Sequence, residues 1–145
     1  MFSQKARGAS WALARAGPVT GPARASAQDA PLAFCENILG SLRTAGIVQS
    51  KRGAEGGYLL AKPPADVTVA DVIRAVDGPL GAVHGDAPEN LAYLGAAARL
   101  VDVWIAVRAS VRDVLERVTL ADLAAGRLPS RVEKLASTPD ARRRR

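Results

Sequence analysis

A short segment in the first half of the chain most constrains what the chain can fold into. Two brief apolar runs, Ile47-Val48 and Tyr58-Leu59-Leu60, flank a loop that contains Lys51, Arg52 and three glycines. Short β-branched or aromatic runs separated by a glycine-containing loop are typical of a β-hairpin. Glycines allow positive φ angles and let a loop backbone approach another surface closely. We therefore predict a hairpin with a positively charged tip.

A helix is predicted immediately before the hairpin. Between residues 32 and 45, apolar side chains recur at spacings of three and four, which defines one buried face of an α-helix. These side chains belong to Phe34, Cys35, Ile38, Leu39 and Leu42. Gly46 follows as a natural C-cap. A helix that leads directly into a basic hairpin is the layout of a winged helix, in which the hairpin forms the wing.

Further helices are predicted after the hairpin. Thr68 is expected to cap a short helix over residues 69–76, and Thr119 to cap another that stops near Gly126. Between them, residues 91–118 predict a long helix that is apolar around more than half of its circumference. Such a helix must be covered on two sides, by its own domain and by the matching helix of a second subunit. The predicted dimerisation residues are Leu100, Val103, Trp104, Val107, Val111 and Val114.

The charge of the chain favours a polyanionic partner. The formal net charge is +6 over 145 residues, and nucleic acid is the first candidate for such a chain. Four arginines in the tail 142–145 supply part of this charge and can simply be solvated. Net charge alone therefore does not establish that the partner is nucleic acid. The single cysteine excludes an intramolecular disulfide and fits a reducing compartment. No apolar run is long enough to span a bilayer, so no membrane partner is expected.

A compound motif gives a more specific indication. Arg52-Gly53-x-x-Gly-Gly57-Tyr58 is followed by Asp71-Val72-Ile73 and then by Gly78-Pro79. With these residues the chain resembles the Rrf-two family of bacterial transcription regulators over roughly residues 18–132, most densely over 34–80. The resemblance implies a mainly α fold with a small β-hairpin wing, which is a winged helix-turn-helix plus a long dimerisation helix. It also implies a cytoplasmic regulator that binds double-stranded DNA as a homodimer, with repression the more common outcome.

The resemblance divides the chain into five parts. Residues 1–17 correspond to a shortened and altered N-terminal helix, and residues 18–80 to the winged helix DNA-binding domain. Residues 81–90 form a loop, and residues 91–135 hold the dimerisation helix and a C-terminal helix. The basic tail 136–145 is expected to be disordered.

The resemblance also implies which residues contact DNA. In the family the helix at 32–45 reads bases, and a wing arginine, here Arg52, enters the minor groove, where negative potential is concentrated. A glutamate such as Glu36 can accept from cytosine N4, and an asparagine such as Asn37 can pair with adenine. Without the adjoining wing, this helix face would be interpreted as merely solvated. The predicted DNA-binding residues are Ala33, Glu36, Asn37, Arg43, Ser50, Lys51, Arg52, Gly53, Gly57 and Tyr58.

No metal, cofactor or catalytic site is predicted. Cluster-bearing members of the family place three cysteines after the pair that matches Gly78-Pro79, and residues 81–98 contain none. Iron–sulfur clusters are held by cysteine thiolates, so the chain is placed in a branch without a cluster. His84 is interpreted as a solvated loop residue. Cys35 lies on the apolar stripe, which favours packing over redox sensing. No nucleophile motif surrounds either residue, so the chain is not expected to be an enzyme.

Two alternatives remain open. The altered segment 1–17 is compatible with a dimeric protein-interaction module that has lost DNA binding. A second alternative keeps DNA binding but adds an effector, either a small molecule or a protein. A small-molecule effector would lie between the winged domain and the long helix, near Tyr93 and Trp104.

Overall fold

The computed structural model describes residues 32–52, 57–82 and 87–142. Its helices are α3 (Leu32–Thr44), α4 (Val69–Asp77), α5 (Leu100–Leu115), α6 (Leu120–Ala124) and α7 (Ser130–Ala136). Strands β1 (Val48–Lys51) and β2 (Gly57–Leu60) form an antiparallel hairpin. The predicted fold class, mainly helical with one hairpin, is confirmed.

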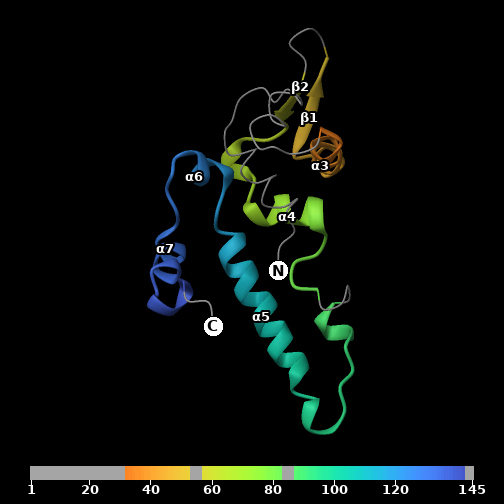
Figure 1. Ribbon diagram of the computed structural model, residues 1–145, viewed down its shortest axis with the longest axis vertical. Helices are drawn as coiled ribbons and strands as arrows, with labels where there is room; N and C mark the ends of the chain where they lie inside the picture. The colour runs from red at the N-terminus through yellow and green to blue at the C-terminus, as the bar shows by residue number, and fades with distance from the viewer. Residues whose placement is uncertain (1–31, 53–56, 83–86, 143–145) are drawn as a thin grey trace.

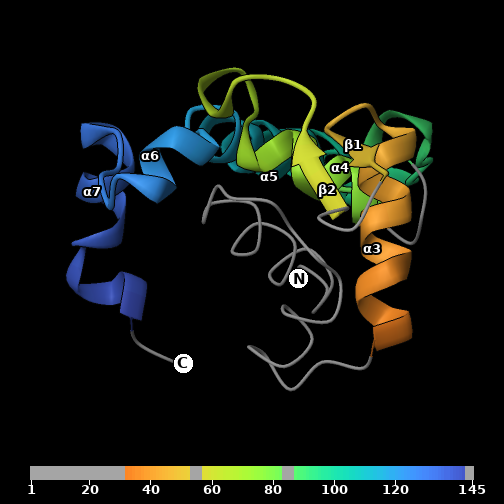
Figure 2. The same cartoon turned by 90° about the horizontal axis from the view of Figure 1, so that it is seen from above.

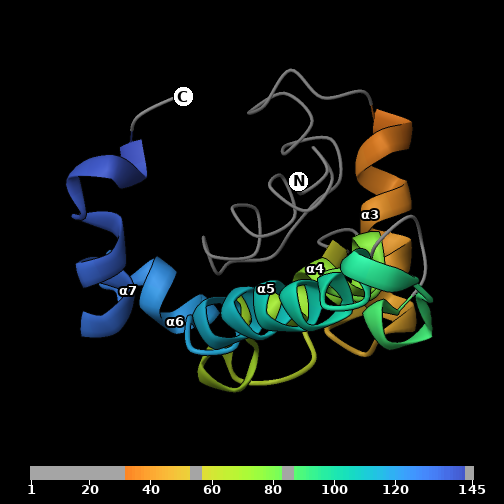
Figure 3. The ribbon, with the colours of Figure 1, turned by 90° about the horizontal axis from the view of Figure 1, so that it is seen from below.

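The hairpin, α3 and α4 lie together, and α5 extends away from them as a long arm (Figure 1). The segment after α4 runs beside this arm to its far end, where the chain turns back into α5. Seen from above and from below, the elements form an arch with α3 at one end and α7 at the other (Figures 2 and 3). The wing and the long helix are therefore on opposite sides of α4.

The helix α3 and the hairpin follow the sequence pattern closely. Ile38, Leu39 and Leu42 are buried, and Leu42 is only 1% exposed. Gly46 ends the helix with φ of 67°, a left-handed conformation that glycine adopts at little cost. The N–H of Ile47 then donates to the Leu42 carbonyl at 2.9 Å, which turns the chain directly into β1.

One core joins the winged domain to the C-terminal part of the chain. Residues from α3, β1, α4 and α6 form its main cluster, which comprises Ile38, Leu42, Ile47, Val48, Val67, Val72 and Leu120. A second cluster under α5 comprises Ala70, Ile73 and Leu80, with Leu115 packed against it. Because Leu120 is fully buried, the winged domain completes its core with residues that lie beyond the boundary predicted at residue 80.

The long helix is shorter than predicted. Residues 91–118 were expected to be helical, whereas α5 covers only Leu100–Leu115. Its start is delayed because 3-10 turns occupy Pro88–Asn90 and Gly95–Ala97, and Gly95 has a left-handed φ of 61° that a right-handed helix cannot contain. Its end is early because Thr119 needs extended backbone to cap α6.

The C-terminal region contains more regular structure than the sequence indicated. The short helix after Thr119 was predicted and is α6. The sequence pattern does not predict α7, which begins directly after Pro129. A 3-10 turn over Pro139–Arg142 lies in the segment for which we expected disorder.

Several predictions fall outside the described residues. They concern the altered segment 1–17, the first part of the winged helix domain (residues 18–31), Gly53 and His84. The side chains of Ala33 and Cys35 are also outside the description, although both positions belong to α3. Among the helices that are described, none is both long enough and apolar enough to cross a membrane.

Candidate nucleic-acid interface

The solvent face of α3 presents polar side chains next to the wing. Glu36, Asn37 and Arg43 are exposed, as predicted from the opposite apolar stripe. The side chains of Glu36 and Asn37 form no hydrogen bond or ion pair within the described part of the chain. The hydroxyl of Ser41 instead donates to the Asn37 carbonyl at 3.1 Å, and that of Thr44 to the Gly40 carbonyl at 3.0 Å. As far as the described residues show, the Asn37 amide and the Glu36 carboxylate are available to a ligand, whereas the two hydroxyls bond to the backbone of the helix.

The wing places its basic residues at the tip. In the hairpin register Val48 pairs with Leu60 near the core, and Lys51 pairs with Gly57 at the outer end. Val48 is buried, whereas Ser50, Lys51 and Arg52 are exposed. Strand pairing therefore anchors one end of the wing and leaves the charged end in solvent (Figure 1).

Tyr58, predicted as a DNA contact, has a structural role as well. It is half-buried and packs against the main core cluster. In the register it pairs with Ser50, so its packing also positions the strand that carries Lys51. Gly57 is half-buried at the same end of the hairpin.

Within the described residues, the positive charges of this surface have no ion-pair partners. Described residues between 32 and 62 carry four cations and one carboxylate, and all four cations are exposed. These cations are Arg43, Lys51, Arg52 and Lys62, and none of them has an ion-pair partner among the described residues. The arginines of α4 and α5 differ, because each lies within 4.0 Å of a carboxylate. Unpaired positive charge next to hydrogen-bonding side chains is the arrangement that a nucleic-acid backbone and base edges require.

Comparison with known proteins agrees with this geometry. The family model Rrf2, described as an iron-dependent transcriptional regulator, matches residues 9–126. The chain belongs to the Rrf2 family. The regulator homologue Rv1287 of Mycobacterium tuberculosis is 50% identical over 112 residues, which cover 77% of this chain and 70% of the relative. The resemblance inferred from the wing motif is thus confirmed.

Solved structures of Rrf2 proteins share the fold. The structure of CymR, described as the global cysteine regulator of B. subtilis, has a TM-score of 0.70 and 33% identity, and the match covers 87% of this chain and 97% of CymR. IscR of T. potens has a TM-score of 0.67 and 33% identity, with 87% of each chain covered. This Rrf2 protein is therefore a transcriptional regulator with a DNA-binding fold, and it is not an enzyme.

The family description raises the question of whether this chain fits a resident iron cluster. Residues 81–98 contain no cysteine, and the described residues contain no group of three potential metal ligands. The pocket beside Gly78 and Pro79 is lined instead by Arg74, Arg108 and Arg112. Guanidinium groups repel cations and offer no lone pair for a metal. The residues present at this position therefore do not fit an iron–sulfur cluster.

The helix α5 carries a second candidate surface. Val103 and Val107 are 51% and 47% exposed, which is unusual for neighbouring valines on one helix face. Trp104 is half-buried, and its Nε1 is buried without an acceptor among the described residues. The other residues predicted for this face are also half-buried, and they are Leu100, Val111 and Val114.

Proposed function

We propose that this Rrf2 protein is a cytoplasmic, sequence-specific DNA-binding repressor that acts as a homodimer without an iron–sulfur cluster. The observation that carries the proposal is the surface shared by α3 and the wing. Its four cations are exposed and have no ion-pair partner in the part of the chain that the structure describes, where the side chains of Glu36 and Asn37 also form no hydrogen bond.

The two parts of this surface have different roles in the proposal. The helix α3 enters the major groove, where Glu36 and Asn37 meet base edges and Ala33 and Arg43 flank them. Arg52 enters the minor groove, where a guanidinium responds to groove width. The remaining wing residues contact phosphates and fix the register on the duplex. They are Ser50, Lys51, Gly53, Gly57 and Tyr58.

A dimer is proposed from the exposed face of α5. Pairing this face with its copy would bury Val103 and Val107. A two-fold dimer presents two α3 helices, so its operator should contain two related half-sites.

Selection of bound sequences from random double-stranded DNA tests the proposal. The full chain should enrich one sequence with two-fold symmetry, and a reporter placed behind that sequence should fall in expression when the protein is produced. Failure to retain any DNA at low salt would contradict the proposal and would favour the protein-interaction module.

A further inference from the structure

A short turn closes the space between α4 and α5. Gly78 and Gly81 have left-handed φ angles of 86° and 69°, and they bracket Pro79 and Leu80. Leu80 is 6% exposed and anchors the turn in the core cluster beneath α5. A Cβ on Gly81 would lie 2.9 Å from the Cβ of Arg108, so only glycine lets the turn approach α5 this closely.

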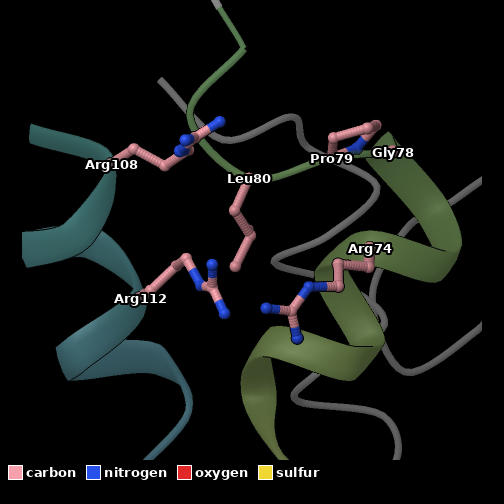
Figure 4. Close-up of a pocket in the computed structure, with 6 residues that line it drawn as sticks. All are labelled: Arg74, Gly78, Pro79, Leu80, Arg108 and Arg112. Atoms are coloured by element: carbon pink, nitrogen blue, oxygen red, sulfur yellow. The ribbon is translucent and has the colours of Figure 1, made fainter. Parts of the chain in front are cut away.

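The turn, α4 and α5 line an open pocket of about 380 Å³. Its lining consists of Arg74, Gly78, Pro79, Leu80, Arg108 and Arg112. The guanidinium groups of Arg74 and Arg112 point toward one another from α4 and α5, and Arg108 reaches in beside Leu80 (Figure 4). Every ionisable group in the lining is therefore an arginine.

Three carboxylates near these arginines lie outside the lining and pair with them. Asp71 lies 3.5 Å from Arg74. Glu116 is shared by Arg112, at 3.0 Å, and Arg74. Glu89 contacts Arg108 at 2.7 Å. Hydrogen bonds from Arg74 and Arg112 lower the pKa of Glu116, so it stays ionised and holds both side chains in place.

The three guanidinium groups retain donors for a ligand. Each guanidinium has five N–H donors, and the contacts to Asp71, Glu89 and Glu116 use only a few of them. The Arg108 side chain is only 23% exposed, so its charge is less screened than that of an ordinary surface arginine. An arginine cluster with free donors is suited to planar carboxylates and to phosphates.

We propose that this pocket binds a small organic anion with at least two carboxylate or phosphate groups, and that the bound anion alters the affinity for DNA. The three arginines would hold the anionic groups, while Pro79 and Leu80 would contact a short carbon skeleton. The volume lies at the small end of the range for ligand sites, which fits a metabolite rather than a large cofactor.

The position of the pocket explains why an anion would affect DNA binding. Arg74 belongs to α4, which packs against α3, whereas Arg108 and Arg112 belong to the proposed dimerisation helix. A ligand that contacts both helices favours one relative arrangement of them. The distance between the two α3 helices of a dimer depends on that arrangement, so operator affinity would change. This second step rests on the proposed function, whereas anion binding itself does not.

Calorimetry on the full chain tests anion binding in the absence of DNA. Citrate and inorganic diphosphate are the probes, at matched ionic strength, and they distinguish carboxylate from phosphate recognition. One of them should bind with one site per chain. Arg108→Gln and Arg112→Gln should each weaken binding about tenfold, which is the effect of losing a charged hydrogen-bonding group.

A matched variant controls for general charge. Arg99→Gln also removes one cation from the α5 region, but Arg99 is 91% exposed and is not in the lining. It should leave affinity unchanged. The proposed site is overturned if neither probe binds at millimolar concentration, or if Arg99→Gln weakens binding as much as the pocket variants.

Operator affinity with and without the bound probe tests the regulatory step. The probe should change the affinity of the wild type and not that of Arg112→Gln. Binding of the probe without any change in operator affinity would overturn regulation but not the site. If the wild type binds the anion and no DNA, the proposed function fails while the anion site stands.

Discussion

Thr68 and Thr119 form an isolated antiparallel β-bridge that ties the start of α4 to the start of α6. On either side of the bridge, backbone N–H groups of Val69 and Leu120 donate across it at 2.8 and 2.9 Å. The bridge seats Leu120 in the core of the winged domain, where it is completely buried. The segment after the long helix is therefore part of the winged domain.

Both bridge residues also cap their helices in the same way. Thr68 accepts from the Asp71 N–H, and the Asp71 carboxylate accepts from the Thr68 N–H at 3.0 Å. Thr119 and Asp122 repeat this reciprocal arrangement at the start of α6. Each bridge residue is thus also the N-cap of a helix, so the two capping boxes set the direction in which α4 and α6 leave the bridge.

Removing one cap should destabilise the whole fold. Thr119→Ala is expected to lower the free energy of unfolding by about 1 kcal/mol, because an N-cap hydroxyl is lost at a helix that helps to complete the core. Urea unfolding followed by circular dichroism measures the change. Ser110→Ala is the matched control, since its hydroxyl donates only to the Ala106 carbonyl on exposed α5. Equal stability of the Thr119 variant and the control would show that α6 is not coupled to the core.

The same cap predicts a dependence of stability on pH. Hydrogen bonds from the Thr119 hydroxyl and N–H lower the pKa of Asp122 below its ordinary 3.8. A carboxyl group with a lowered pKa in the folded state stabilises the protein above its ordinary pKa, and this contribution is lost as the pH falls through the lowered value. The wild type should therefore have a higher free energy of unfolding than Asp122→Asn at neutral pH, and this difference should shrink in acid. Unfolding curves across this range measure it, and a gap that widens in acid would contradict the assignment.

Anaerobically purified protein should be colourless and free of stoichiometric iron. The reason is the absence of cysteine in residues 81–98 together with the arginine lining beside Gly78 and Pro79. Visible absorbance and an iron assay on protein that was never exposed to air provide the test. A sulfide-to-iron charge-transfer band would refute the proposed cluster-free state.

Local signals in the sequence were sufficient for the elements that position the interface. The spacing of Ile38, Leu39 and Leu42 predicts the buried face of α3, and Gly46 marks where the helix ends. Thr68, followed by Asp71 three residues later, predicts the start of α4. Each signal acts within one or two helical turns, where short-range hydrogen bonds and periodicity decide the structure.

Long-range relationships could not be predicted in this way. Nothing in the spacing of Arg74 and Arg112 indicates that they share Glu116, because this contact requires α4 to pack against α5. The effector site near Tyr93 and Trp104 stays a prediction, and neither residue lines the arginine pocket. Apolar periodicity also continues on both sides of Gly95, so the pattern predicts a helix that starts before this glycine. In the structure Gly95 has a left-handed φ, and α5 begins only at Leu100.

A charge on the exposed face of α5 should prevent dimerisation. Val107→Glu would place a carboxylate without a partner in the proposed contact, so the dissociation constant of the dimer should rise about tenfold or more. Sedimentation equilibrium at micromolar concentration measures it. Ala109→Glu is the control, since Ala109 is exposed on the side of α5 away from Val103 and Val107. A monomeric wild type, or equal dissociation in both variants, would refute this interface.

Arg52 and Glu36 should differ in what they contribute to DNA binding. Arg52→Ala is expected to weaken binding to most sequences, and to lower the slope of log affinity against log salt by about one unit, because one counterion is no longer released. Lys134→Ala removes an exposed cation far from the wing and should change neither quantity. Fluorescence anisotropy with labelled duplexes at several salt concentrations provides both values.

Glu36→Ala should alter discrimination and leave general affinity intact. A carboxylate that faces DNA costs affinity unless a base amino group meets it, so its removal should cost roughly 1–3 kcal/mol of preference at one base pair. Binding to random DNA should hold or rise, since a negative charge has been removed from the contact. Competition between the selected operator and its single-base variants locates the affected position. Loss of all binding in Glu36→Ala, together with an unaffected Arg52→Ala, would mean that α3 and the wing do not occupy the grooves as proposed.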